Sequence, residues 1–168
     1  MELLKEIYDQ DIGLDKKDYS DINQVRKSAR AVILNNNKIA IIYASKENYH
    51  KLPGGKLEEN EDVITALKRE SLEEAGCNIK NIKELGCIIE YKNKSKKLHI
   101  SYGYLADADG DIKDPQFTER EKDQGFELIW LPIDEAISRM EKDSPENYHA
   151  KYIVARELTY LKKARELI

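Results

Sequence analysis

Residues 52–77, with the sequence LPGGKLEENEDVITALKRESLEEAGC, restrict the fold of this chain more than any other segment. A proline and two glycines interrupt regular structure, and the residues after them follow the 3.6-residue period of a helix. Gly76 is of a type favoured just beyond a helix end. We therefore predict a glycine loop followed by a helix over residues 62–75, whose buried stripe consists of Val63, Ile64, Leu67, Ser71 and Ala75.

Three glutamates crowd one edge of this predicted helix. Glu70 precedes Glu73 and Glu74 by three and four residues, a spacing that brings helical side chains within about 5 to 6 Å. Two such charges repel by about 3 kcal/mol at an effective dielectric near 20, and the negative end of the helix dipole adds to that cost. A divalent cation would offset the repulsion, and Mg²⁺ prefers carboxylate oxygens. The segment therefore allows two interpretations, a solvated acidic face or a metal site.

The residues before the helix favour the metal site. Pro53, Gly54 and Gly55 form a loop of bare backbone, which can direct carbonyl groups to a cation or amide groups to a phosphate. An ion pair between Glu61 and Arg69 would tie this loop to the helix. We expect that pair to hold the neighbouring carboxylates in place.

The spacing of these residues resembles the Nudix box. Every charged and glycine position of the box is present: Gly55, five residues, Glu61, seven residues, Arg69-Glu70, two residues, Glu73-Glu74, one residue and Gly76. Ser71 departs from the family, which usually has an aliphatic residue there, whereas Cys77 fills the final apolar position. The resemblance extends over residues 30–136 and includes the LPGG motif and Trp130-Leu131-Pro132. It implies an α/β fold, an α/β/α sandwich around a mixed β-sheet.

The resemblance also implies chemistry. The expected cofactor is Mg²⁺, with Mn²⁺ as a substitute, and water attacks phosphorus without a covalent enzyme intermediate. The implied metal ligands are the Gly55 carbonyl and the carboxylates of Glu70, Glu73 and Glu74. The implied substrate-binding residues are Gly54, Gly55 and Lys56. The implied catalytic residues are Glu61, Arg69, Glu70, Glu73 and Glu121. The general base stays open between Glu70 and a glutamate near the last strand, which is Glu119, Glu121 or Glu127.

The expected substrate is a small nucleotide-like molecule in which a nucleoside diphosphate is linked to another moiety. Nucleoside triphosphates, nucleotide sugars and dinucleoside polyphosphates all remain open. One alternative is a non-catalytic nucleotide-binding Nudix module, although the complete set of box glutamates argues against it. Another is an RNA 5′-end pyrophosphohydrolase, although the net charge of −4 argues against a broad nucleic-acid surface. A homodimer is common in the family.

The composition supports a globular protein. A chain of 168 residues has room for one domain with a proper core, and we divide it into an arm over residues 1–27 and a Nudix domain over residues 28–168. No apolar run approaches the ~18 residues of a membrane span, and the N-terminus lacks the pattern of a secretory signal, so we expect a cytoplasmic protein. Cys77 and Cys87 match neither a disulfide framework nor a zinc motif.

Outside the box, β-type patterns predominate. Residues 29–43 read as a hairpin around three asparagines, and residues 82–91, 98–106 and 126–131 read as further strands. Residues 132–140 and 148–167 read as helices, and residues 107–124 as a polar loop. The lysines between 92 and 97 are expected in a solvated turn. Alternate residues of the 98–106 strand should pack in the core: Leu98, Ile100, Tyr102 and Tyr104.

Overall fold

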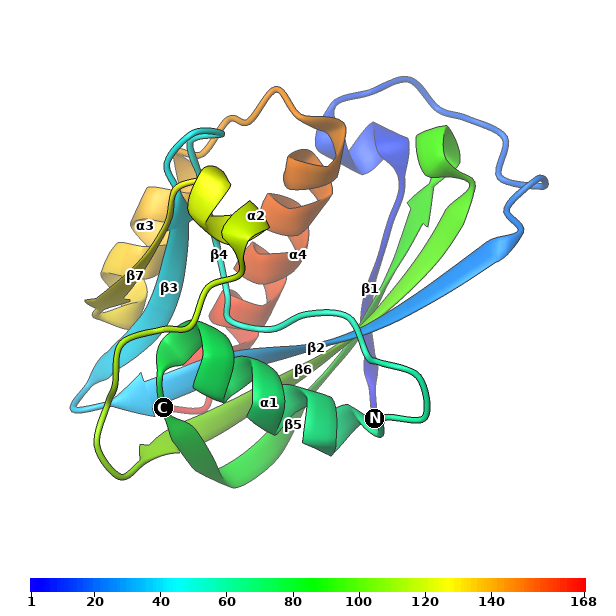
Figure 1. Ribbon diagram of the computed structural model, residues 1–168. Helices are drawn as coiled ribbons and strands as arrows, with labels where there is room; N and C mark the ends of the chain where they lie inside the picture. Colours follow the sequence, from blue (N-terminus) through cyan, green and yellow to red (C-terminus); the bar gives the residue numbers. More distant parts are fainter.

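The computed structural model describes residues 1–168 and shows a seven-stranded mixed sheet with helices on both faces (Figure 1). The strand order is β1-β5-β6-β2-β3-β4, and β7 pairs with β3. The strands are β1 Leu3–Ile7, β2 Gln24–Asn35, β3 Lys38–Ala44, β4 Tyr49–Lys51, β5 Asn78–Lys92, β6 Lys97–Asp109 and β7 Phe126–Leu131. The helices are α1 Val63–Ala75, α2 Glu119–Asp123, α3 Ile133–Glu141 and α4 Tyr148–Arg165, with short 3₁₀ turns at Asp9–Ile12 and Asn93–Ser95.

Two apolar clusters hold the layers together, one on each face of the sheet. The larger cluster packs α3 and α4 against residues such as Val32 and Ile88, and the smaller one packs α1 against residues such as Ala31 and Ile33. Alternate residues of β2 therefore enter opposite clusters, as expected for a strand covered on both faces. This arrangement confirms the predicted α/β/α sandwich around a mixed sheet.

Local interactions explain why α1 begins and ends where it does. The Asp62 carboxylate accepts hydrogen bonds from the backbone N–H groups of Ile64 and Thr65, each at 3.0 Å, and so caps the helix start. Gly76 has φ of 67°, and a Cβ atom there would come within 1.8 Å of the Lys113 carbonyl oxygen. The buried Ser71 hydroxyl donates to the Leu67 carbonyl at 2.7 Å, which satisfies this polar group in the stripe. The predicted helix is confirmed. Of its predicted stripe, Leu67, Ser71 and Ala75 are buried, while Val63 and Ile64 are half-buried.

The first 27 residues contribute to the same sheet as the rest of the chain. β1 pairs parallel with β5 at the sheet edge, and β2 begins at Gln24 and pairs parallel with β6 over most of its length. The division of the chain at residue 28 stays a prediction. No helix in the structure combines the length and apolar character that crossing a membrane requires.

Two expectations about connecting segments are wrong. The segment 107–124 is not a continuous loop, because β6 extends to Asp109 and a Thr118 capping box starts the short helix α2. Lys92 is not part of a solvated turn, because it ends β5 with only 6% of its surface exposed and its Nζ lies 3.2 Å from Glu90. In the 98–106 strand, Tyr104 is buried, as expected, while Leu98, Ile100 and Tyr102 are half-buried.

Candidate active site

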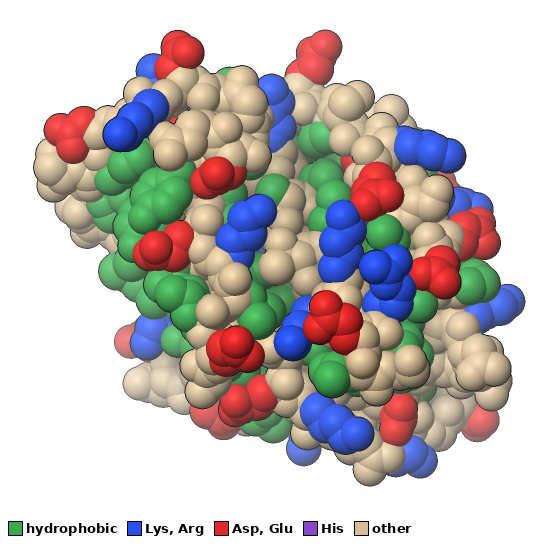
Figure 2. Space-filling model, turned by 180° about the vertical axis from the view of Figure 1, so that it is seen from behind, with side chains coloured by type: hydrophobic (Ala, Val, Ile, Leu, Met, Phe, Trp, Pro, Cys, Tyr) green, Lys and Arg blue, Asp and Glu red, His purple; other side chains and the backbone are tan.

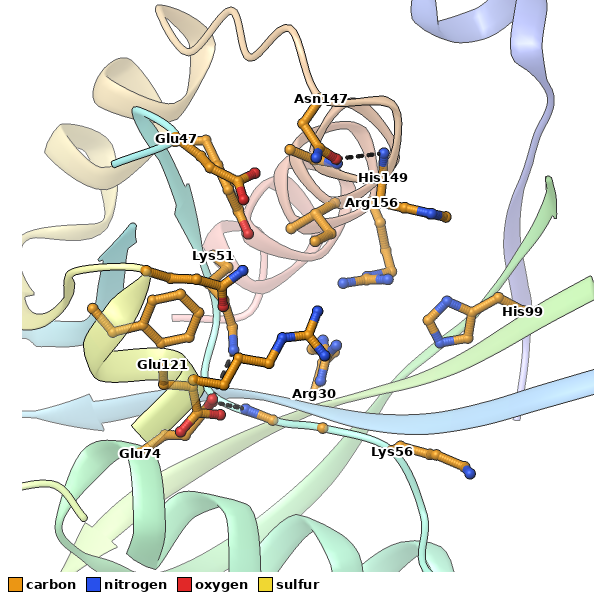
Figure 3. Close-up of a pocket in the computed structure, with 18 of the residues that line it drawn as sticks. Arg30, Glu47, Lys51, Lys56, Glu74, His99, Glu121, Asn147, His149 and Arg156 are labelled. Carbon is orange, nitrogen blue, oxygen red and sulfur yellow. Dashed lines mark hydrogen bonds and ion pairs between the residues drawn. The ribbon is translucent and has the colours of Figure 1, made fainter. Parts of the chain in front are cut away.

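A cavity of about 480 Å³ opens between the glycine loop, α2, α4 and the adjoining face of the sheet. At its loop end lie Gly54, Gly55, Glu70 and Glu74. Its other walls are formed by β2, β5, β6 and α4, and Figure 3 shows His99 and Arg156 on the side away from the loop. The cavity therefore connects the predicted box residues with side chains far from them in the sequence.

The glycine loop is bound tightly to β2 and α1. The Gly54 N–H donates to Glu74 Oε2 at 2.7 Å, and the Pro53 and Gly55 carbonyl groups accept from the N–H groups of Ala31 and Ala29, both at 3.0 Å. A Cβ atom at Gly55 would lie 2.1 Å from Glu70 Oε1. Only glycine therefore allows the Glu70 carboxylate to lie against this backbone.

The predicted ion pair between Glu61 and Arg69 is confirmed. Arg69 Nε and Nη2 each lie 2.9 Å from a Glu61 oxygen, while Nη1 lies 2.8 Å from Glu70 Oε1 and 3.2 Å from Glu73 Oε2. These contacts raise the pKa of Arg69, and the Arg69 hydrogen bond lowers the pKa of Glu61. One guanidinium group thus ties the loop to the helix and reduces the repulsion among the box carboxylates.

Glu74 has a cationic partner that the sequence did not indicate. It is 3% exposed, and its Oε1 lies 2.7 Å from Nζ of Lys51 on β4. Burial raises the pKa of Glu74, although Lys51 and the Gly54 N–H oppose that effect. Lys51 also lies 4.9 Å from the centre of the Phe126 ring. Glu74 therefore anchors the glycine loop between α1 and β4.

The carboxylates of Glu70, Glu73 and Glu74 are of the chemical type that binds a divalent cation, but they are not arranged as a complete set of ligands. The structure contains no group of three acidic, histidine or cysteine side chains arranged to hold an ion, and Arg69 and Lys51 bind several of the carboxylate oxygens. Glu70 and Glu73 each keep one carboxylate oxygen without a protein partner, whereas both Glu74 oxygens are engaged. Hard oxygen donors of this kind fit Mg²⁺ or Mn²⁺. The donor set therefore fits a cation, most directly at Glu70 and Glu73.

The three candidate bases near the last strand occupy different positions. Glu121 on α2 is half-buried and lines the cavity, where its Oε2 accepts the Thr118 N–H at 2.8 Å. Glu119 pairs with Lys122 and its side chain is 88% exposed, and Glu127 is exposed on β7. Of these three glutamates, only Glu121 belongs to the cavity wall. Lys56 also lines the cavity and has no ion-pair partner.

A buried ionic network lies behind the far wall of the cavity. Arg156 contacts both Glu90 oxygens at 3.2 Å and Glu157 at 2.6 Å, and Arg30 contacts Glu157 at 3.1 Å. Burial alone would raise the pKa of Glu90, but Arg156, Lys92 and His99 hold it well below its usual value. The network joins β2, β5, β6 and α4. Sequence reasoning missed it, and the only signal was charged residues at alternate positions of otherwise apolar strands.

Ser28, His99 and Glu90 have the connectivity of a nucleophile, base and acid. Ser28 Oγ lies 2.8 Å from His99 Nε2, and His99 Nδ1 lies 2.5 Å from Glu90 Oε2. Ser28 is completely buried, however, and does not line the cavity, and its hydroxyl also contacts Ser101 at 3.1 Å. A substrate has no access to that hydroxyl, so these residues connect strands rather than supply a nucleophile.

Lowering the pH from 7 to 5 should destabilise the fold through His99. Burial, together with Arg156 and Lys92, lowers the pKa of His99 to about 3 against the opposing pull of Glu90. The folded ring therefore stays neutral where the unfolded ring, with a pKa near 6.5, takes up a proton. The stabilisation is complete above about pH 6.5 and is lost as the pH falls toward 3, by up to about 1.4 kcal/mol per pH unit.

Urea unfolding of the wild type and His99→Asn at pH 7 and pH 5 measures this effect. The asparagine retains an N–H donor toward Glu90 but does not titrate. The variant should therefore lose less stability than the wild type between the two pH values. Equal losses in the two proteins would contradict the assignment to His99.

Together, the sandwich, the glycine loop and the acidic helix define an α/β protein in which carboxylates and basic side chains line one cavity. The sequence profile of the NUDIX domain matches residues 25–153. The chain therefore belongs to the Nudix hydrolase family, as the box predicted, and this family generally uses a divalent metal ion.

Comparison with known proteins places the chain near MutT-like members of the family. It is 40% identical over 73 residues to the 8-oxo-dGTP diphosphatase of Buchnera aphidicola subsp. Schizaphis graminum, a match that covers 41% of this chain and 55% of that protein. The chain thus spans about half the length of that relative. The crystal structure of a MutT NUDIX hydrolase from Burkholderia pseudomallei is 25% identical, covers 81% of this chain and 99% of its own, and has a TM-score of 0.54.

A NUDIX hydrolase from Nitrosomonas europaea shares the fold with a TM-score of 0.60 at 18% identity. That match covers 79% of this chain and 87% of the other. These likenesses confirm the predicted family and fold.

Proposed function

We propose that this protein is a Mg²⁺-dependent pyrophosphohydrolase that cleaves a phosphoanhydride bond in a nucleotide-like diphosphate. One observation carries the proposal: the glycine loop, Glu70 and Glu74 form one end of a cavity whose other walls carry an excess of lysine and arginine side chains. That combination suits a diphosphate, because a metal ion and basic side chains together neutralise its oxygens. The half-length match to an 8-oxo-dGTP diphosphatase points in the same direction.

Each predicted site residue has a proposed role. Glu70 and Glu73 offer their free carboxylate oxygens to Mg²⁺ or Mn²⁺. Glu74 and the Gly55 carbonyl would contribute the lone pairs that their hydrogen bonds to Lys51, Gly54 and Ala29 leave unused. When bound, the ion supplies charge neutralisation and lowers the pKa of a coordinated water. Glu61 and Arg69 are positioning residues, because they hold the carboxylates against the glycine loop.

The remaining residues orient the substrate and accept a proton. Lys56 contacts phosphate oxygens, whereas the Gly54 N–H donates to Glu74 and so holds the glycine loop in position beside the substrate. Glu121 or Glu70 accepts the proton of the attacking water. The water oxygen forms a bond to one phosphorus, the bond from that phosphorus to the bridging oxygen breaks, and the leaving phosphate retains the bridging oxygen. The products are a nucleoside monophosphate and a second phosphorylated compound.

A substrate panel tests the proposal. The purified chain is incubated with Mg²⁺ and with nucleoside triphosphates including 8-oxo-dGTP, nucleotide sugars, dinucleoside polyphosphates, and capped or triphosphorylated RNA. Cleavage of a small molecule that stops when EDTA removes the metal is the expected result. Binding without cleavage would favour a non-catalytic module. Cleavage of RNA alone would favour an RNA 5′-end enzyme. The net charge argued against that alternative, whereas the cationic cavity supports it.

A further inference from the structure

The far end of the cavity is separated from the glycine loop by several residues of β2. Arg26, Ser28 and Arg30 occupy alternate positions of that strand and face α4, on the same side as Val32. Arg30 lies against the loop, since a Cβ atom at Gly54 would come within 3.0 Å of Arg30 Nη1. Arg26 is four residues away along the strand, which corresponds to roughly 13 Å.

Three cationic side chains meet at this far end because of the strand register. Arg26 is paired with His99 of β6, and Lys97 of β6 is paired with Lys92 of β5. All three cations line the cavity. We call the group formed by Arg26, Lys92 and Lys97 the distal subsite. Figure 3 shows the surroundings of this end, with His99 on the sheet side and His149 and Arg156 projecting from α4.

Positive charge in this cavity exceeds what the fold neutralises. Eight lysine and arginine side chains line the cavity, against four glutamates. The surface in Figure 2, by contrast, has basic and acidic side chains interspersed. Glu90 balances Lys92 and Arg156 from beneath the wall. Arg26 and Lys97 form no ion pair, and the Nε atom of Arg26 is buried without a hydrogen-bond partner.

These cations affect one another. Burial lowers the pKa of Arg26, and Arg30 and Arg156 lower it further. Burial also lowers the pKa of Lys92 to about 8, with Arg156 and Arg26 acting in the same direction against Glu90. Partly buried cations without partners cost stability. Glu90 offsets part of that cost for Arg26 and Lys92, and a bound anion would offset the rest.

The separation of the two ends restricts what this anion is. The phosphates of a nucleoside triphosphate are joined through single bridging oxygens and span less than four residues of an extended strand. A nucleobase is also a poor occupant, because base recognition uses aromatic platforms. The aromatic rings at this end are the imidazoles of His99, which is 3% exposed, and His149, which packs edge-on against Tyr148, while Phe126 lies near Lys51 at the loop end. The apolar lining contributed by α4 is limited to Ala150 and Ile153.

We propose that the distal subsite binds a second phosphoryl group of the substrate, carried by the moiety attached to the scissile diphosphate. The substrate class is therefore an organic diphosphate that also bears a phosphomonoester, and this refinement rests on the proposed function. The box end holds the diphosphate, and Arg26 and Lys97 form charge-assisted hydrogen bonds to the distant phosphate.

Two matched substrate pairs test the proposal, namely NADPH with NADH and coenzyme A with dephospho-coenzyme A. Members of a pair share the diphosphate and differ by one phosphomonoester on the ribose. With Mg²⁺ present, kcat/KM should be about 10-fold or more higher for the phosphorylated member of at least one pair. The Arg26→Gln/Lys97→Gln variant should reduce that ratio to near one. Lys94→Gln changes an exposed lysine in the turn between β5 and β6, outside the cavity. This variant should keep the wild-type ratio of kcat/KM values.

A binding measurement separates this proposal from the proposed function. With EDTA present to prevent turnover, NADPH should raise the Tm of the wild type more than NADH does, and the double variant should lose the difference. If these Tm differences are found but no substrate is hydrolysed, the proposed function is refuted and the distal subsite is still supported. Equal Tm shifts for NADPH and NADH, or a difference that survives in the double variant, would overturn the distal subsite whether or not the protein is an enzyme.

Discussion

Replacing Glu73 by glutamine is expected to lower Mg²⁺-dependent turnover by about 100-fold or more while the fold stays intact. The Glu73 side chain is 45% exposed, and its only polar contact is with Arg69 at 3.2 Å. Its loss should therefore cost little stability. Glutamine keeps the shape but removes the charge that a hard cation requires, and a 100-fold loss corresponds to about 2.7 kcal/mol of transition-state stabilisation. Initial rates over a Mg²⁺ titration, with urea unfolding of the same variant, measure both quantities.

Two further variants make this experiment specific. Glu59→Gln removes an exposed glutamate of the neighbouring loop and should leave the rate unchanged. Glu74→Gln should lower the rate and the stability together, because it leaves the Lys51 ammonium, 9% exposed, without its partner. Full turnover in Glu73→Gln would remove Glu73 from the metal site.

Replacing Arg156 by methionine is expected to lower the free energy of unfolding by about 3 to 5 kcal/mol. Arg156 is 1% exposed and binds Glu90 and Glu157, both completely buried. Methionine fills much of the space but leaves two carboxylates with fewer cationic partners. Since a domain of this kind is stable by only about 5 to 15 kcal/mol, this single change should remove a large fraction of its stability. Urea unfolding measures the difference.

An exposed ion pair provides the matched control. Arg139 pairs with Glu135 across one turn of α3, and both side chains are close to half exposed, so Arg139→Met should cost about 0.5 kcal/mol or less. If Arg156→Met does not fold, Arg156→Lys should lose less stability, because it keeps a positive charge beside Glu90 and Glu157. A cost for Arg156→Met no larger than that for Arg139→Met would show that the network contributes nothing of note.

Local sequence determined the box and its helix. The cap at Asp62, the stop at Gly76 and the stripe that includes Leu67 depend on residues within a few positions of one another, so the 3.6-residue period predicted them. The Glu61 to Arg69 contact follows for the same reason, since only eight residues separate its partners. Strands β2, β3, β5, β6 and β7 and helices α3 and α4 were likewise found from local patterns, with boundaries shifted by a few residues, whereas strands β1 and β4 were not predicted.

Only the tertiary structure decided what faces the box across the cavity. Lys51 on β4 contacts Glu74 on α1, and Arg30 contacts Glu157 across 127 positions of the sequence. Arg26 and Lys97 lie at the same end of the cavity because β2 and β6 are neighbouring strands. Strand order cannot be read from periodicity, and a net charge of −4 averages over the whole surface. The net charge of the whole chain therefore did not indicate that this cavity is locally basic. Short-range geometry set the acidic end of the site, and long-range packing set the cationic end.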